Sequence, residues 1–241
     1  YEVFTYEGVT PEAAASVGGT AIATNTTSMD VFNVYMTGTL SWGLQAGDIK
    51  AVAGYEWRQQ GYQRISDIFY QEGLLLGQGG SIPNIDGKYR VNELFAEASV
   101  PLLADRSWAR MMALDLAYRW SDYSSTGPSS TYRIGLDWQA TEVLRVRTGY
   151  NRAVRSPNVN ELFAAQNLGL WTGVDPCATA TPVYTLEQCA RTGVTAAQYG
   201  NILESPAGQY NGIFGGNQDL DPETADTFTF GIVIEPINMM Q

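Results

Sequence analysis

Residues 111–122 read Met-Met-Ala-Leu-Asp-Leu-Ala-Tyr-Arg-Trp-Ser-Asp, and this stretch decides the fold class. Every second position is apolar, and polar or charged residues stand at several of the positions between them. The apolar positions are Met112, Leu114, Leu116, Tyr118 and Trp120, and the polar ones are Asp115, Arg119 and Ser121. A period of two places successive side chains on opposite faces of a β-strand. The stretch therefore predicts a strand with one apolar and one polar face.

The same alternation recurs in six further stretches, so the chain as a whole predicts an all-β fold. These stretches are residues 30–41, 48–58, 89–102, 131–139, 143–155 and 227–235. Within 48–58, Ala53 and Trp57 belong to the apolar set, whereas Lys50 and Arg58 belong to the polar set. We therefore predict seven antiparallel strands of the same two-faced type.

Strand length separates the two architectures that such strands build. A soluble β-sandwich is the alternative to a membrane barrel, because both show alternation. Several stretches approach the roughly 9 to 11 residues that cross a bilayer, whereas average globular strands have about 5 to 6. Trp57, Trp120 and Trp138 lie near strand ends, where aromatic rings suit membrane interfaces. We therefore predict a transmembrane β-barrel segment whose apolar face contacts lipid, and expect Ala53→Arg to damage folding far more than Gly54→Arg.

Seven strands do not make a closed barrel of the bacterial kind, which has an even number of strands. Two open strand edges in lipid would leave backbone groups without partners. We interpret residues 1–241 as part of one larger β-barrel domain. The segments predicted to be extracellular loops are 1–29, 59–88, 123–130 and 156–226; short links lie at 42–47, 103–110 and 140–142.

Composition argues against two broad classes of function. The formal net charge is −11, so the chain lacks the basic surface that nucleic acid requires. It contains no His, which removes imidazole metal sites and the common Ser-His-Asp and Cys-His nucleophiles. We therefore expect neither an enzyme nor a nucleic-acid-binding protein, and we expect no catalytic residue, metal or cofactor.

Cys177 and Cys189 are the two cysteines of the chain, and they lie close together in a stretch rich in Thr, Ala and Pro. Such a pair predicts a local disulfide, which would imply an oxidising compartment. Two reduced thiols in a cytosolic loop are the alternative.

Three stretches carry a resemblance to a known family. The first is Leu44–Arg58, which includes Gly-Tyr-Glu-Trp-Arg, and the second is Val91–Pro101. The third and most specific is Leu144–Phe163, completed by Gly216-Asn217 and by Leu220 to Thr224. In this order and strand context, they resemble the TonB-dependent outer-membrane receptors.

The resemblance implies a 22-stranded barrel in the outer membrane of a Gram-negative bacterium. It implies a receptor that binds a scarce nutrient outside the cell and imports it to the periplasm with energy supplied by TonB. The TonB complex would act through a plug domain, which is not present in these 241 residues. The implied partners are outer-membrane lipid, TonB and a small-molecule cargo, with no nucleic acid. A passive porin or a surface adhesin is the alternative function.

Six residues of the third stretch and its completion are expected to act as a structural motif. They are Arg155, Pro157, Glu161, Leu220, Pro222 and Glu223. We expect them to lock the long loop to the barrel rim rather than to contact cargo. The cluster Asp219, Asp221 and Glu223 raises the alternative of a Ca²⁺ site, but the EF-hand pattern is absent and turn chemistry is favoured.

The long loop also carries the candidate cargo-binding residues. Aromatic rings interleaved with amides suit sugars, which stack on one face and hydrogen-bond at their edges. The candidates are Trp171, Tyr199, Tyr210 and Asn211. They favour an oligosaccharide as cargo; a ferric siderophore and ordinary loop packing are the alternatives.

Overall fold

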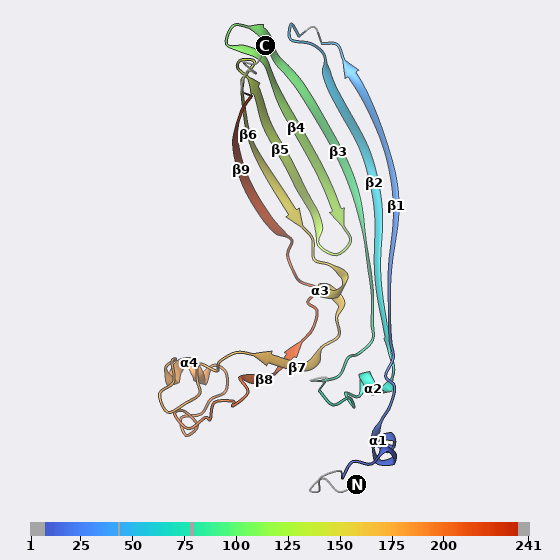
Figure 1. Cartoon of the computed structure of the whole chain (residues 1–241), viewed down its shortest axis with the longest axis vertical. Helices are drawn as coiled ribbons and strands as arrows, with labels where there is room; N and C mark the ends of the chain where they lie inside the picture. Colours follow the sequence, from blue (N-terminus) through green and yellow to red (C-terminus); the bar gives the residue numbers. More distant parts are fainter. Residues whose placement is uncertain (1–7, 43, 78–79, 236–241) are drawn as a thin grey trace, which may run out of the picture. The chain divides into compact units, whose positions relative to one another are not determined.

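The computed structural model describes residues 8–42, 44–77 and 80–235. Among these residues, seven strands form one sheet in the order β1-β2-β3-β4-β5-β6-β9, and two more form a separate hairpin (Figure 1). The strands of the large sheet are β1 (Ala23–Leu40), β2 (Ile49–Ser66), β3 (Ile85–Arg106), β4 (Ala109–Tyr123), β5 (Gly127–Gln139), β6 (Leu144–Arg155) and β9 (Glu223–Ile234). The hairpin consists of β7 (Asn167–Thr172) and β8 (Gln209–Phe214). The prediction of an all-β antiparallel fold is confirmed.

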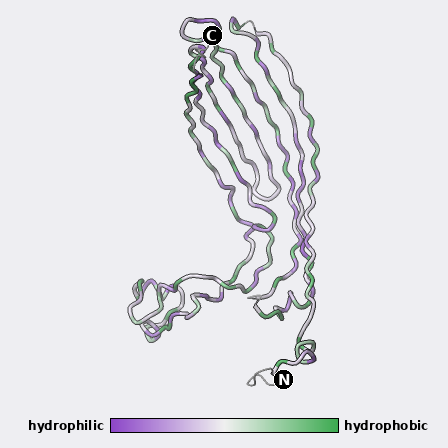
Figure 2. Tube along the Cα trace, in the orientation of Figure 1, coloured by the Kyte–Doolittle hydropathy of each residue, from purple (hydrophilic) through white to green (hydrophobic). Residues whose placement is uncertain are grey.

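The register of the large sheet gives it one apolar and one polar face. Leu116 stands opposite Ile134, and Tyr150 stands opposite Phe228. The neighbouring positions on the other face are polar, as where Asp137 stands opposite Arg147. Hydrophobic and hydrophilic residues alternate along the strands accordingly (Figure 2). Because apolar side chains meet apolar side chains across four successive strand pairs, the two faces stay distinct from β3 to β9.

The large sheet is not closed in this chain. β1 and β9 are its edges, and every residue of both strands is exposed. Large apolar side chains are among the exposed groups: Phe228 is 82% exposed and Phe230 is 71% exposed. The sheet thus matches the prediction of seven strands belonging to a larger barrel, whereas the total of 22 strands stays a prediction.

Four short helices accompany the strands in the described residues. They are α1 (Pro11–Val17), α2 (Ile68–Gln71), α3 (Val159–Phe163) and α4 (Leu186–Ala190). Among residues 8–42, 44–77 and 80–235, no helix is both long and apolar enough to span a bilayer.

The chain divides into two compact units, which we describe separately. The wall unit contains 26–63, 86–164 and 216 onward, and with them most of the large sheet. The loop unit contains the described parts of 1–25 and 64–85 together with 165–215. Three segments that are far apart in the sequence therefore form a single compact body.

The strands extend further than the alternation predicted. β1 begins inside predicted loop 1–29, whose residues 1–7 lie outside the described residues. β2 and β3 both run into predicted loop 59–88, and β5 begins inside 123–130. Segment 156–226 contains two helices, the hairpin and the start of β9. The strands extend beyond the predicted ends because backbone hydrogen bonds continue the ladder where side chains on both faces are polar, as at Gln59, Gln60 and Gln63.

Candidate functional site

Arg155, the last residue of β6, joins both ends of the long connection to the large sheet. It stands opposite Glu223, the first residue of β9, and its Nη2 donates to Glu223 Oε1 at 2.8 Å. Its Nη1 donates to Glu161 Oε2 at 3.1 Å. The structure thus brings together three of the six residues predicted as a structural motif. We call Arg155, Glu161 and Glu223 the rim clamp.

A capping box holds the helical member of the rim clamp in place. The Asn158 side chain accepts from Glu161 N at 3.0 Å, and Asn158 N donates to Glu161 Oε2 at 2.8 Å. This reciprocal pairing satisfies two free amides at the start of α3. The Asn158 backbone N–H, together with the Arg155 guanidinium, holds the pKa of the Glu161 carboxyl below its ordinary value.

A small apolar cluster lies beneath α3 and fixes it against the sheet. Val159 and Leu162 are buried with Tyr89 of β3, and Tyr62, Tyr123 and Phe163 pack against them. Pro157 is also buried, just before α3. The chain returns at Gly216, whose N donates to Ala164 O at 2.7 Å. The two ends of the excursion 165–215 are therefore in direct contact within the wall unit.

The other two members of the predicted motif lie in the return segment. Leu220 is 38% exposed and Pro222 is partly buried, both in the turn before β9. Asp219 N donates to Asn217 Oδ1 at 2.9 Å, as expected of turn chemistry. Within the described parts of the chain, no group of three or more His, Cys, Asp or Glu side chains is arranged to hold a metal ion.

Direct contacts join the three segments of the loop unit. Ile22 N donates to Asp67 Oδ2 at 2.5 Å, which links the first segment to the second. Asn167 Nδ2 donates to Ser81 O at 3.0 Å, which links the second segment to β7. The β7–β8 hairpin therefore has support from another part of the chain, which an isolated hairpin needs for stability.

One face of the hairpin carries a row of three aromatic rings. Trp171 stands opposite Tyr210, with ring centroids 5.9 Å apart, and Trp171 is 46% exposed. Phe214 lies over the facing glycines Gly169 and Gly212, where an added Cβ would lie 2.9 Å from its ring atoms. We call Phe214, Trp171 and Tyr210 the aromatic row. Phe214 is an aromatic residue of the long loop that is not among the four candidates chosen from the sequence, although a glycine within a strand is a signal of close approach.

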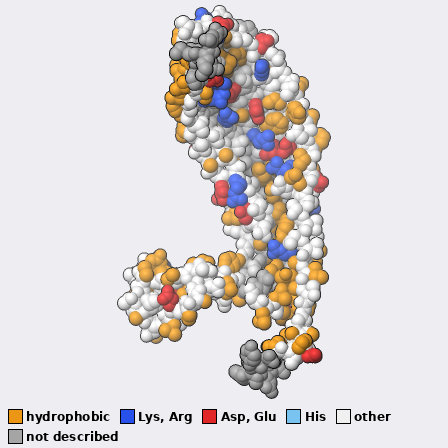
Figure 3. All heavy atoms as spheres, in the orientation of Figure 1, with side chains coloured by type: hydrophobic (Ala, Val, Ile, Leu, Met, Phe, Trp, Pro, Cys, Tyr) orange, Lys and Arg blue, Asp and Glu red, His pale blue; other side chains and the backbone are white. Residues whose placement is uncertain are grey.

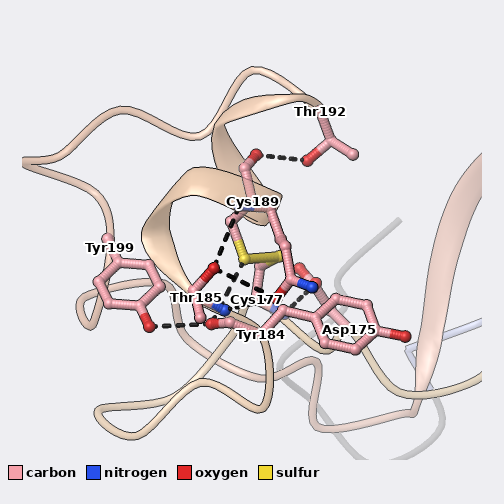
Figure 4. The surroundings of a disulfide bond; sticks show 8 residues. Asp175, Cys177, Tyr184, Thr185, Cys189, Thr192 and Tyr199 are labelled. Atoms are coloured by element: carbon pink, nitrogen blue, oxygen red, sulfur yellow. Dashed lines mark hydrogen bonds between the residues drawn. A yellow bond between two sulfur atoms is a disulfide. The ribbon is translucent and has the colours of Figure 1, made fainter.

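Tyr199 and Asn211 do not belong to the aromatic row. Asn211 follows Tyr210 directly in β8, so its side chain lies on the opposite face of the hairpin. The Tyr199 hydroxyl donates to Tyr184 O at 2.8 Å (Figure 4). Of the four predicted cargo residues, the structure therefore places two side by side and directs the other two elsewhere.

Cys177 and Cys189 form a disulfide, which confirms the predicted pairing (Figure 4). Cys189 is fully buried, and its N donates to Thr185 O at 3.0 Å in α4. A second capping box, between Thr185 and Gln188, begins this helix. The disulfide and the capping box together order a segment that has only one turn of helix.

The polar face of the wall unit contains an ion-pair network that the sequence reasoning did not identify. Glu93 is only 3% exposed, and it accepts from Ser121 Oγ at 2.6 Å. Arg119 Nη1 lies 3.2 Å and Arg58 Nη1 3.7 Å from the same carboxylate. Charged side chains of both signs lie along the large sheet in Figure 3. Because this carboxylate has two cations and a hydroxyl, its burial is compensated.

Comparisons with known proteins agree with this architecture. Two solved structures resemble the chain: the siderophore receptor PirA from Acinetobacter baumannii and a mutant of the ferric enterobactin receptor PfeA from Pseudomonas aeruginosa. The first has 15% sequence identity and a TM-score of 0.57, and the matched region covers 88% of this chain and 25% of the PirA chain. The second has 18% identity and a TM-score of 0.53, with coverage of 89% and 25%. The likeness shows the fold, and the chain spans a quarter of the length of each relative.

Two further comparisons used the sequence. None of the curated proteins compared with the chain matches it. A family model, described as TonB dependent receptor-like, beta-barrel, matches residues 2–239. The match covers nearly the whole sequence and includes the rim clamp and every strand of the large sheet. The chain therefore belongs to the TonB-dependent receptor-like β-barrel family.

Proposed function

We propose that this chain is part of an outer-membrane receptor that captures a scarce nutrient and imports it to the periplasm with energy from TonB. The observation that carries the proposal is a two-faced barrel wall, of this family, joined to a compact loop unit with an exposed aromatic row. A wall of this kind suits lipid on one side and a polar lumen on the other.

Aromatic contacts at both ends of the apolar face support placement in a membrane. Near one end, Trp138 Nε1 donates to Trp108 O at 3.1 Å. Toward the other end, Tyr150 lies between Tyr132 and Phe228, at centroid distances of 5.9 and 4.7 Å. From Met112 to Trp120, β4 extends about 27 Å along its own axis, which corresponds to a height of about 19 to 22 Å at the strand tilt of outer-membrane barrels. The apolar face thus approaches the height of the apolar band in such barrels, which is about 25 Å.

The aromatic row is the proposed contact surface for cargo. Trp171 offers an exposed ring plane, and Tyr210 has its hydroxyl 3.3 Å from Ser205 N, the backbone amide that donates to it. Asn211 and Tyr199 lie outside the row, so any contact that they make with cargo would belong to a second surface of the loop unit. Stacking planes of this kind favour an oligosaccharide.

A ferric siderophore is the second candidate cargo. It is favoured by the two solved relatives, which are described as a siderophore receptor and a ferric enterobactin receptor. Both candidates require a receptor that binds before it transports, whereas a passive porin or an adhesin would not need TonB.

The test uses the full-length receptor and a panel of probes: malto-, xylo- and chito-oligosaccharides, and ferric catecholates and hydroxamates. We expect Trp171→Ala to weaken binding of the true cargo class by about fivefold, the loss of roughly 1 kcal/mol of aromatic contact. Leu170→Ala, next to it on the other hairpin face, is the matched control and should bind normally. Equal affinity of both variants and wild type for every probe that binds would refute cargo capture by the aromatic row.

Transport is tested separately by measuring uptake in cells with and without TonB. We expect uptake of the bound probe to stop without TonB. Uptake that continues unchanged would indicate a passive porin, and binding without any uptake in either strain would indicate an adhesin.

A further inference from the structure

Lys88 and Arg90 lie on the apolar side of β3, beyond its apolar stretch. Tyr89 and Val91, which flank Arg90 in the strand, are buried on the face that α3 covers. Because successive side chains of a strand point to opposite faces, Lys88 and Arg90 share a face with Leu94. Both basic residues are exposed. They therefore project from the side of the wall that is apolar further along the same strand.

Neither basic side chain has a carboxylate partner in the described structure. The ion pairs among residues 8–42, 44–77 and 80–235 include neither Lys88 nor Arg90. The nearby Asp86 carboxylate accepts from Gln63 Nε2 at 3.5 Å. Most basic residues of the polar face, by contrast, are paired, as Arg58 and Arg119 are with Glu93. In the described structure, Lys88 and Arg90 are thus presented outward without an ion-pair partner, on a face that also carries the carboxylates of Asp86 and Asp122.

The height of the pair along the wall is set by the β4–β5 turn. Ser124 N donates to Arg90 O at 2.8 Å, and Arg90 N donates to Ser124 Oγ at 2.9 Å. Trp120 stands opposite Leu94, four residues further into both strands. Lys88 and Arg90 therefore lie at the level where β4 ends and β5 begins, just beyond the aromatic side chain of Trp120.

We propose that Lys88 and Arg90 form a binding site for the phosphate groups of membrane lipid at the rim of the barrel. This inference rests on the proposed function, because it requires the apolar face to lie in a bilayer. Basic side chains at headgroup level attract anionic lipid, whereas the same residues within the apolar band would be costly to insert. Gln63, near the end of β2, and Ser124, just after β4, flank β3 on its two sides, and their amide and hydroxyl groups suit phosphate oxygens.

The experiment reconstitutes the full-length receptor in vesicles of equal parts phosphatidylcholine and phosphatidylglycerol. Spin-labelled forms of the two lipids report which one the protein holds at its surface. We expect wild type to prefer phosphatidylglycerol, and Lys88→Gln and Arg90→Gln each to reduce that preference by about fivefold. The matched control is Lys50→Gln, because Lys50 lies on the polar face of β2 in a groove lined also by Glu97 and Arg133.

Two outcomes would overturn the site. An unchanged lipid preference in the Lys88→Gln/Arg90→Gln variant would show that these residues bind no headgroup. Binding of inorganic phosphate by wild type, together with no preference for phosphatidylglycerol in the vesicles, would show that the site takes a free anion rather than lipid. Failure of wild type to insert into phosphatidylcholine vesicles would instead contradict the membrane placement, and with it the proposed function as well.

Discussion

Phe95 and Gly54 illustrate how single residues fix the polar face. A Cβ at Gly54 would lie 2.5 Å from Phe95 Cζ and 2.7 Å from Val34 O, so no larger residue fits. The Arg119 guanidinium lies 5.0 Å from the centroid of the Phe95 ring, a cation–π distance. Gly54→Arg is therefore a poor low-cost comparison for Ala53→Arg, because a side chain at position 54 would collide with Phe95 and with the backbone of Val34.

Glu161 gives the rim clamp a defined dependence on pH. Its pKa is lowered in the folded chain, chiefly by the Asn158 N–H and then by Arg155. A carboxyl with a lowered pKa contributes stability above its unfolded pKa of about 4.3, and this contribution is lost as the pH falls through the folded value. We expect hydrogen exchange of α3 amides to accelerate in Glu161→Gln relative to wild type at neutral pH, and the difference to vanish in acid.

The control for this prediction is Glu187→Gln, which removes an exposed carboxylate of α4 paired with Arg191. It should leave exchange in α3 unchanged at every pH, because it lies in the other unit. Protection of α3 that is equal in wild type and Glu161→Gln at neutral pH would contradict a role for the rim clamp.

At the scale of elements, the disulfide should decide how well α4 is ordered. Closing a loop of this size contributes about 3 kcal/mol in the chain-entropy model. Arg191 follows α4 directly, and its side chain is 74% exposed, so trypsin can report on local order. We expect Cys177→Ala/Cys189→Ala to increase the rate of cleavage after Arg191 by at least tenfold, measured by mass spectrometry. Cleavage at the wild-type rate would show that the Thr185–Gln188 capping box and packing suffice to order α4.

Alternation predicted every strand of the large sheet but not the extent of each. Residues such as Leu114 and Leu116 carry a strong period-two signal, because one face is apolar. At Gln60 and Gln63 both faces are polar, and the strand persists through backbone pairing that side chains do not reveal. The hairpin escaped prediction because Gly169 and Gly212 interrupt its pattern and its pairing spans a long insertion.

At the scale of the whole molecule, the two faces of the wall unit differ in how well they tolerate an added charge. Ala53 is exposed on the apolar face, and Val52 lines a groove of about 730 Å³ on the polar face. We expect Ala53→Arg to destabilise the receptor in lipid by about 2 to 4 kcal/mol, and Val52→Arg to cost much less. Folding yields in lipid vesicles, followed by heat-modifiable gel mobility, measure the difference. Equal yields for the two variants would refute the assignment of the faces.

The sequence predicted several individual residues of the candidate site, but it did not predict which distant segments come together to form the site. Arg155, Glu161 and Glu223 were singled out from a motif, and Cys177 and Cys189 from their spacing. The convergence of the three loop segments depends on contacts such as Asn167 with Ser81, which join residues far apart in the sequence. The network around Glu93 was missed for the same reason, since its members come from three different strands.

The contact between Ala164 and Gly216 has a consequence for how such receptors change over time. Because Ala164 and Gly216 are already in contact at the two ends of residues 165–215, the folding of the wall unit depends little on the length or sequence of the segment between them. Doubling the length of a flexible insertion adds only about 0.6 kcal/mol of closure entropy. Residues 165–215 can thus be replaced, lengthened or given a different sequence during evolution while the strands of the wall unit stay the same.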